Sequence, residues 1–266
     1  MAEVGAIALR DEDVRQAEVG GAVVYYQDEA SFRTARRNIY EQRVYHFVAE
    51  SARPRVVDGG AHIGLATLYF KKLYPQSQVI CFEPDPAAVR LLRRNLAANG
   101  LTDVEVVEAG LSDRTGTAGF WSDGRDGGRL TGEGGRADRV RTVRLSDYLR
   151  TPADFVKLNI EGAEGPVLRD LDRHGTLRQI QELVIEYHGW PGGPQPLGSI
   201  LEVLDRHGFR YLVHDFDRET NPASKPPFRL RPETPWFCLV YARRGGPPAA
   251  GDRQHCEESA RGDEVD

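Results

Sequence analysis

The sequence contains few cysteines, no long apolar run and no excess of positive charge. Its three cysteines, Cys81, Cys238 and Cys256, lie too far apart for a zinc site or a disulfide framework, and they fit a reducing compartment. No apolar stretch approaches the ~20 residues that a membrane-spanning helix needs. The N-terminus carries early acidic residues and lacks the pattern of a signal peptide. We therefore expect a cytoplasmic protein with no membrane association.

Charge is nearly balanced, with 35 basic and 40 acidic residues among 266. Residues 244–266 are rich in acids and small residues, and we expect a disordered acidic tail there. Without this tail the body of the chain is close to neutral, so no basic field remains to neutralise the phosphates of a nucleic acid. These properties favour a small-molecule partner and exclude neither a monomer nor an oligomer.

Apolar runs that alternate with helical patterns predict an α/β fold with a parallel sheet. The expected strands cover residues 56–58, 78–82, 104–108, 155–159 and 183–187, with a last antiparallel pair at 211–214 and 236–241. A hairpin of residues 118–121 and 140–145 is expected to flank a glycine-rich surface loop, 122–139. The expected domain thus covers residues 55–243 and follows an N-terminal extension, residues 1–54.

The N-terminal extension contains apolar residues at helical spacing, which predict a helix that Pro54 ends. The spaced apolar residues are Tyr40, Val44, Phe47 and Val48. This helix either packs on the sheet or caps the cofactor pocket. The polar candidates for such a cap are Arg36, Asn38, Tyr40 and Glu41.

The most informative motif follows the first strand of the expected domain, where Asp58-x-Gly60-x-x-x-Gly64 leads into a helix. Small residues in such a turn let the backbone approach a ligand closely. A dinucleotide site requires G-x-G-x-x-G, whereas this spacing, with the acid at the strand end, is typical of S-adenosylmethionine (SAM) binding. Glu83-Pro84 ends the second strand about 20 residues later, where a carboxylate can bind both ribose hydroxyls.

Other residues at strand ends complete the expected cofactor site. We expect Asp58 to bond the amino end of SAM and His62 to contribute mainly its backbone amide. The segment after the third strand should lie against adenine, with Leu111 covering a ring face, although Ser112 or Asp113 could instead cap a helix. The expected cofactor-binding residues are Asp58, Gly60, His62, Gly64, Glu83, Pro84, Gly110, Leu111, Ser112, Asp113 and Asn159.

His188 follows the fifth strand and is the expected catalytic base. Methyl transfer is an in-line displacement, and a hydroxyl nucleophile benefits from a nearby base whose pKa is close to neutral. Glu161 and Glu186 also follow or end strands, and we group them with His188 as the catalytic residues. The three side chains could hold a divalent ion, but the simpler interpretation is that both glutamates bond backbone amides. We therefore expect no metal.

Five blocks of residues together resemble the FkbM-type SAM-dependent methyltransferases. The blocks are residues 57–64, 82–85, 92–96, 157–164 and 185–188. The resemblance spans about residues 38–243, and the E-G-A-E sequence at 161–164 makes it specific. It implies the Rossmann-like, seven-stranded class I methyltransferase sheet with an antiparallel last strand. Two positions differ, because the family usually has aspartate in place of Asn159 and commonly has asparagine in place of His62.

The resemblance also implies O-methylation of a hydroxyl on a small molecule, such as a natural product or a sugar-type acceptor. N- or carboxyl-methylation is the alternative, because an amine acceptor does not need His188 as a base. The missing G-x-G-x-x-G disfavours a nicotinamide-dependent oxidoreductase. A SAM-binding protein without activity stays possible because of the departure at Asn159. No motif identifies the methyl acceptor.

Overall fold

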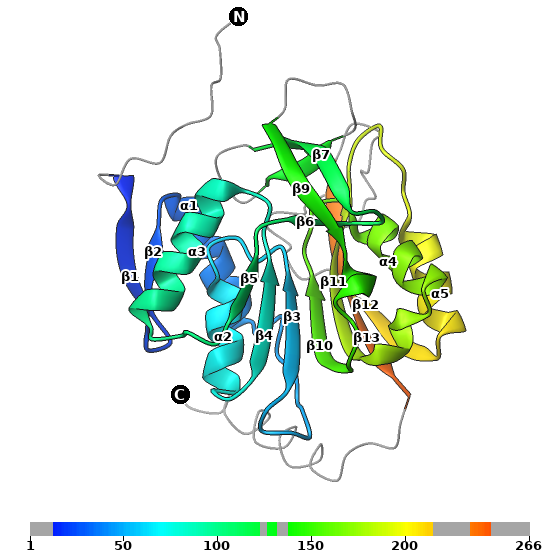
Figure 1. Cartoon of the computed structure of the whole chain (residues 1–266), viewed down its shortest axis with the longest axis horizontal. Helices are drawn as coiled ribbons and strands as arrows, with labels where there is room; N and C mark the ends of the chain where they lie inside the picture. The colour runs from blue at the N-terminus through cyan, green and yellow to red at the C-terminus, as the bar shows by residue number, and fades with distance from the viewer. Residues whose placement is uncertain (1–12, 123–126, 132–137, 215–234, 246–266) are drawn as a thin grey trace, which may run out of the picture.

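The computed structural model describes residues 13–122, 127–131, 138–214 and 235–245 of the 266-residue chain. Its centre is a seven-stranded sheet in the order β12-β13-β11-β10-β3-β4-β5, in which β13 runs antiparallel to both neighbours (Figure 1). The strands are β3 (Arg55–Gly59), β4 (Gln78–Phe82), β5 (Glu105–Val107), β10 (Ala153–Leu158), β11 (Ile180–Gly189), β12 (Phe209–His214) and β13 (Trp236–Arg244). This order confirms the expected Rossmann-like sheet with an antiparallel last strand.

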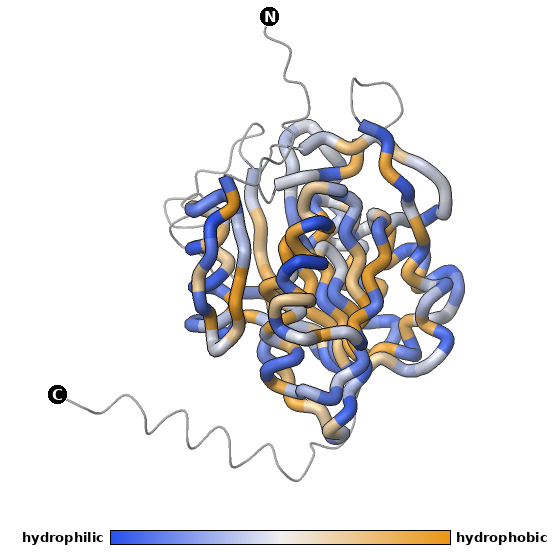
Figure 2. The backbone as a smooth tube through the Cα atoms, turned by 60° about the vertical axis from the view of Figure 1, so that its left-hand side comes forward, coloured by the Kyte–Doolittle hydropathy of each residue, from blue (hydrophilic) through white to orange (hydrophobic). Residues whose placement is uncertain are grey.

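Helices cover both faces of the sheet and bury alternate residues of its strands. Val56 and Val79 pack toward α2 and α3, whereas Val57 and Ile80 belong to the core on the side of α4 and α5. Hydrophobic stretches accordingly run through the centre of the molecule (Figure 2). Because a parallel sheet is buried on both faces, its strands read as continuous apolar runs. The helices are α2 (Leu65–Leu73), α3 (Pro86–Ala98), α4 (Glu164–Arg173) and α5 (Leu197–Arg206), with short 3-10 turns at Leu145–Asp147 and Thr176–Gln179.

Helix α3 begins and ends at the residues that the sequence predicts. Asp85 is its N-cap and accepts a hydrogen bond from the Ala87 amide at 2.8 Å, and Pro86 occupies the first turn. Gly100 follows the helix in a left-handed conformation (φ +67). The capped start fixes the path from β4 into α3 and so holds Glu83 at the end of its strand.

The N-terminal extension forms a hairpin of β1 (Arg15–Val19) and β2 (Ala22–Tyr26), followed by α1 (Glu29–Arg36) and a π-helical turn, Arg37–Glu41. The expected helix through Val48 is therefore wrong, since helical structure ends at Glu41 and Arg43 has a positive φ (+56). The Phe47 ring instead stacks on Phe155 of β10, with 4.3 Å between ring centroids. The apolar spacing in this segment thus reflects burial against the sheet.

A second sheet, of order β6-β9-β7-β8, lies above the seven-stranded sheet in Figure 1, next to the carboxyl ends of the parallel strands. It consists of β6 (Gly110–Ser112), β7 (Gly116–Trp121), β8 (Arg129–Thr131) and β9 (Asp138–Arg144). The antiparallel pairing of β7 with β9 confirms the expected hairpin. Strand β8 falls where the sequence predicted only a loop, so that expectation is wrong for residues 129–131.

Several expectations concern residues outside the described part of the chain. These are the remainder of the glycine-rich loop (123–126 and 132–137) and nearly all of the expected acidic tail (246–266). No helix within the described ranges is long and apolar enough to cross a membrane.

Candidate functional site

The turn after β3 places backbone atoms at the edge where the parallel strands end. Gly60 (φ +77), His62 (φ +50) and Gly64 (φ +92) have left-handed backbone conformations, which are uncommon for a residue such as histidine. A Cβ on Gly60 would collide with the carbonyl oxygen of Asn159, so glycine is required there. The Gly60 amide donates to the carbonyl of Phe82 at 3.0 Å and ties the turn to β4. The turn is therefore fixed on both sides.

Asp58 lies beneath this turn and is fully buried. Its Oδ1 atom accepts a hydrogen bond from the Lys157 ammonium at 2.8 Å, and its Oδ2 atom accepts one from the Thr67 hydroxyl at 2.7 Å. Lys157 also donates to the carbonyl of Gly60 at 2.8 Å. The two oxygens of Asp58 thus each have a partner inside the protein, and its expected bond to the amino end of the cofactor stays a prediction.

Glu83 ends β4 with a buried carboxylate. One oxygen accepts from the amide of His62 at 2.8 Å, and the other accepts from the amide of Asp85 at 2.9 Å. Burial raises the pKa of Glu83 to about 7 against the opposing effect of these two amide donors. A carboxylate has about four lone-pair sites, so Glu83 can still accept bonds from two further donors. Pro84, half-buried, leads from it into the cap of α3.

The segment expected to contact adenine forms β6 and belongs to the small sheet. The Leu111 side chain is buried in the core and fills the space beside Gly59, so the expectation that it covers a ligand ring is wrong. Gly110 packs against β8. Ser112 and Asp113 line the cavity described below, and no helix follows them that they could cap.

The end of β10 forms the middle of the site. The Oδ1 atom of Asn159 is buried and has no hydrogen-bond partner among the residues that the structure describes. Its Nδ2 atom lies 3.5 Å from the hydroxyl of Tyr45, while its backbone carbonyl touches Gly60. A buried acceptor without a donor is energetically costly. Asn159 therefore offers an acceptor to the N–H group of a ligand beside the glycine turn.

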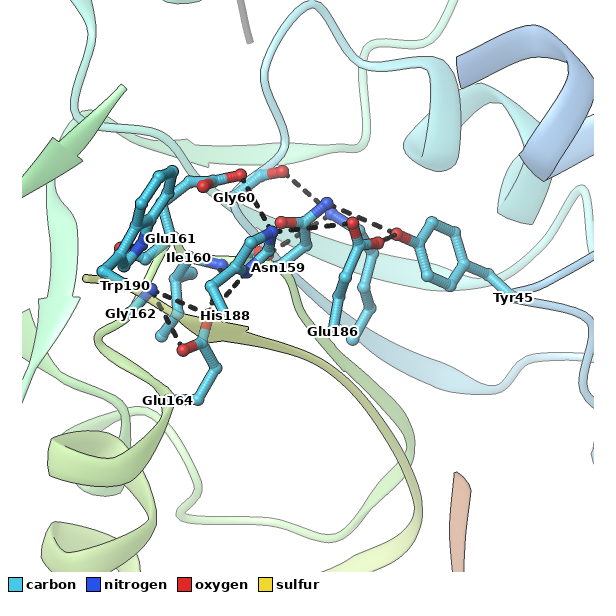
Figure 3. Close-up of polar contacts among 12 residues, drawn as sticks. Tyr45, Gly60, Asn159, Ile160, Glu161, Gly162, Glu164, Glu186, His188 and Trp190 are labelled. Carbon is cyan, nitrogen blue, oxygen red and sulfur yellow. Dashed lines mark hydrogen bonds and ion pairs between the residues drawn. The ribbon is translucent and has the colours of Figure 1, made fainter. Parts of the chain in front are cut away.

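The E-G-A-E turn folds around Glu164. Its buried carboxylate accepts from the amide of Ile160 at 3.1 Å and from the amide of Gly162 at 3.0 Å. Glu161 has a positive φ (+55), and its side chain lies beside His188 (Figure 3). The Trp190 indole donates to the Glu161 carbonyl at 3.0 Å. Glu164, to which the sequence assigned no role, binds the backbone amides of this turn, and Glu186 accepts a hydrogen bond from the Tyr45 hydroxyl.

His188, near the end of β11, lies among three glutamates (Figure 3). Its Nε2 atom is 3.4 Å from Glu161 and 3.7 Å from Glu186, and its Nδ1 atom is 3.5 Å from Glu164. Burial lowers the pKa of His188, but the three carboxylates raise it more, to about 10. A raised pKa favours the protonated imidazole at neutral pH, and this disfavours the predicted role of His188 as the base. The role of His188 in the reaction stays a prediction.

Tyr45 brings the N-terminal extension into the site. Its hydroxyl donates to Glu186 at 2.8 Å, and its ring centroid lies 5.4 Å from the Lys157 ammonium. The extension thus reaches the site through Tyr45, a residue outside the polar set that the sequence suggested. Within the described residues, the acidic and histidine side chains form no group of three or more that could hold a metal ion.

A cavity of about 740 Å³ opens beside the glutamate cluster, between the E-G-A-E turn and the small sheet. Ser112, Asp113 and Arg129 line it from the segment that forms the small sheet, while Glu161 and Trp190 line it from the loops that follow β10 and β11. Glu161 is the member of the His188 cluster that reaches this cavity. The cofactor-type turn and the cavity therefore meet at the end of β10.

Sequence reasoning missed Lys157, Tyr45, Glu164 and Arg129 as residues that shape the site. Lys157 carried a signal, because a charged residue inside an apolar parallel strand must find a buried partner. Glu164 was quoted within a motif but given no role. Tyr45 and Arg129 carried no local signal, since their roles depend on contacts with distant strands.

Comparison with known proteins gives a consistent result. The family described as "Methyltransferase FkbM domain" matches residues 58–211. The methyltransferase sdnD of Sordaria araneosa is 31% identical over 213 residues, which cover 65% of this chain and 80% of that protein. The 2-O-methyltransferase NoeI of Sinorhizobium fredii is 27% identical over 180 residues, covering 58% of this chain and 72% of that one. The crystal structure of an FkbM methyltransferase from Methylobacillus flagellatus is similar at 18% identity, with a TM-score of 0.47, over 73% of this chain and 45% of that chain.

Proposed function

Since the chain belongs to the FkbM methyltransferase family, we propose that it transfers the methyl group of SAM to a hydroxyl of a small molecule. The observation that carries this proposal is the position of β10. Asn159 faces the glycine turn on one side, and two residues later Glu161 lines the cavity on the other. A cofactor held on the turn would present its reacting end to an acceptor held in the cavity.

The residues on the cofactor side fit SAM. Glycine is required at position 60 because the Asn159 carbonyl occupies the space of a Cβ, and this close packing brings Asn159 directly beside the turn that would hold the methionine portion. The unpartnered Oδ1 of Asn159 suits an ammonium donor, and the buried carboxylate of Glu83 suits the two ribose hydroxyls. SAM, when bound, supplies an electrophilic methyl group on a sulfonium. Lys157 and Asp58 support this half of the site by holding the Gly60 carbonyl in place.

On the acceptor side we assign the proton transfer to Glu161. Glu161 lines the cavity, and its carboxylate would accept the hydroxyl proton as the hydroxyl oxygen takes the methyl group, with demethylated SAM leaving. His188, whose Nε2 atom lies 3.4 Å from Glu161, orients the Glu161 carboxylate. Glu164 fixes both residues, since it shapes the E-G-A-E turn and lies 3.5 Å from the imidazole.

The proposal is tested by turnover and by calorimetry on the full chain. A panel of hydroxylated small molecules is incubated with SAM, and demethylated SAM is measured. We expect product with at least one hydroxyl acceptor, an at least tenfold loss of SAM affinity in Glu83→Ala, and near-normal SAM affinity with roughly 100-fold lower turnover in Glu161→Gln. Wild-type SAM affinity in Glu83→Ala would refute the ribose assignment. Unchanged turnover in Glu161→Gln would refute the base assignment.

An amine acceptor is the second candidate, and one observation favours it. Three glutamates surround one histidine, so the cluster carries a net negative charge that attracts a cationic amine. Including primary and secondary amines in the same panel separates the two: product from amines alone would replace O-methylation by N-methylation.

A further inference from the structure

We propose that the methyl acceptor carries an anionic group, a carboxylate or a phosphate, and that Arg129 binds it. This inference rests on the proposed function and names the substrate class of the same site. Arg129 begins β8 and lines the same cavity as Glu161 and Gly162 of the E-G-A-E turn. Its guanidinium carbon lies 4.8 Å from the ring centre of Trp121 and 4.5 Å from that of Trp190. Two indoles from different elements therefore hold one arginine at the cavity wall.

The contacts of Arg129 leave its hydrogen-bonding capacity unused. Stacking on an aromatic ring engages the face of a guanidinium, whereas its five N–H donors point outward in the plane. Within the described ranges, the side chain of Arg129 makes no hydrogen bond and no ion pair within 4.0 Å. The nearby acids Asp113 and Glu161 line the same cavity but do not pair with it. A guanidinium group that is fixed in place and has no ion-pair partner can donate two parallel hydrogen bonds to a carboxylate or a phosphate.

Trp190 sets the distance between this cation and the reacting end of the site. Its indole lies against Arg129, its Nε1 donates to the Glu161 carbonyl at 3.0 Å, and its ring is nearly parallel to that of His188 at 12°. Trp190 therefore contacts both Arg129 and the turn that carries Glu161. We expect an acceptor whose acid and hydroxyl are several bonds apart. Arg114 adds a second positive charge to the lining of the same cavity.

The test measures binding through the tryptophans, independently of turnover. The probes are D-glucuronate, with its neutral amide as control, and D-glucose 6-phosphate, with glucose as control; quenching of tryptophan fluorescence is recorded in the full-length protein. Wild type should bind at least one anionic probe about tenfold more tightly than its neutral counterpart. Comparing the two pairs tells carboxylate from phosphate. Equal binding within both pairs, or no response to either anion, would overturn the proposal.

Variants assign the effect to Arg129. Arg129→Met should abolish the preference for the anion, and Arg129→Lys should retain part of it, since the charge remains but the planar fork is lost. Arg141→Met, at an exposed position of β9 in the same small sheet that does not line the cavity, should behave as wild type. An unchanged preference in Arg129→Met contradicts the proposal. If Arg129→Met fails to fold, the Arg129→Lys titration alone decides, because equal affinities of wild type and Arg129→Lys also contradict it.

The failure of this proposal differs from that of the proposed function. Intact SAM binding and turnover without any preference for an anionic acceptor would leave the methyltransferase and remove the role of Arg129. If the protein binds anions through Arg129 but does not bind SAM, the anion site stands and the proposed methyltransferase function fails.

Discussion

The ammonium of Lys157 lies 2.8 Å from the carboxylate of Asp58, and both side chains are buried in the central sheet. The two residues face each other in register on β10 and β3. Lys157 also reaches the carbonyl of Gly60 at 2.8 Å, so the ion pair supports the glycine turn from below. A charge pair in this position links the stability of the sheet to the shape of the cofactor site.

Replacing Lys157 with methionine is expected to destabilise the protein by about 3–5 kcal/mol, because Asp58 would remain buried without its partner. The double variant Asp58→Asn/Lys157→Met should recover much of this loss. Lys72→Met, at an exposed position of α2, serves as control and should change the free energy of unfolding by no more than about 0.5 kcal/mol. Denaturant titrations measure all three. A single variant as stable as wild type contradicts the structural role of the pair.

Gly60→Ala is expected to abolish SAM binding. It should also lower the free energy of unfolding by more than the cost of placing alanine at a positive φ. The added Cβ would collide with the Asn159 carbonyl. Gly100→Ala is the matched control, since Gly100 has a similar φ (+67) but nothing within 4 Å of an added Cβ. It should cost only about 1–2 kcal/mol for the left-handed backbone. Equal destabilisation by the two variants would show that the close approach at Gly60 is unimportant.

Glu83 should make stability depend on pH in a predictable direction. Its folded pKa, about 7, lies above that of an unfolded glutamate, so ionisation of the folded state is disfavoured and stability falls as pH rises from about 4.5 to 7. Glu83→Gln lacks this titration. Relative to wild type, the variant should gain on the order of 3 kcal/mol between pH 4.5 and pH 8. If the free energy of unfolding depends on pH in the same way for wild type and Glu83→Gln across this range, the pKa of Glu83 is not raised.

The same carboxylate should make cofactor affinity pH-dependent. Protonation removes an acceptor from the proposed ribose contact, so SAM affinity in wild type should weaken as pH falls below 7. Calorimetry at pH 6, 7 and 8 measures this dependence. Glu83→Gln should bind more weakly throughout and show no such change.

His188 has the opposite sign in its effect on stability. Its folded pKa is raised, so its ion pairs stabilise the protein fully below about pH 6.5 and lose their effect as pH rises toward 10. The destabilisation caused by His188→Gln should therefore shrink by a few kcal/mol, on the order of 3–5, between pH 6 and pH 10. In addition, kcat is measured at pH 6 and pH 7 for wild type and for His188→Gln. We expect no decrease between pH 7 and pH 6 that is present in wild type and absent in the variant. Such a loss would reinstate His188 as the base.

The sheet could be predicted from sequence because its strands are buried on both faces. Strand β4 begins and ends at Gln78 and Phe82, as predicted, since an apolar run between turn residues has few other interpretations. The start of α3 followed from Asp85 and Pro86, whose capping chemistry is local. The segment around Phe47 failed for the opposite reason. Its helical spacing came from packing against Phe155, 108 positions further along, which no local pattern reveals.

The positions of the site residues followed from the topology, but the partners of their side chains did not. Asn159 and His188 lie at the carboxyl ends of β10 and β11, where strand-end reasoning places them, whereas Asp58 is buried in β3 beside Lys157. Their roles depend on neighbours that are distant in sequence. Lys157 occupies Asp58, and Glu164 adds a third carboxylate around His188, which moves its pKa away from neutrality. A sequence motif gives the type of residue at a position, while its protonation depends on the assembled surroundings.

The chain segment that forms the small sheet begins and ends at neighbouring positions in the fold. Gly110 pairs with Thr142 and Ser112 pairs with Arg144, so the two ends of this excursion lie side by side although some thirty residues separate them. The segment between them can therefore be exchanged as a cassette without altering any strand of the seven-stranded sheet. Such an exchange would replace Trp121 and Arg129 together and leave Glu83 and the glycine turn untouched. Acceptor choice could then be re-engineered separately from binding of the methyl donor.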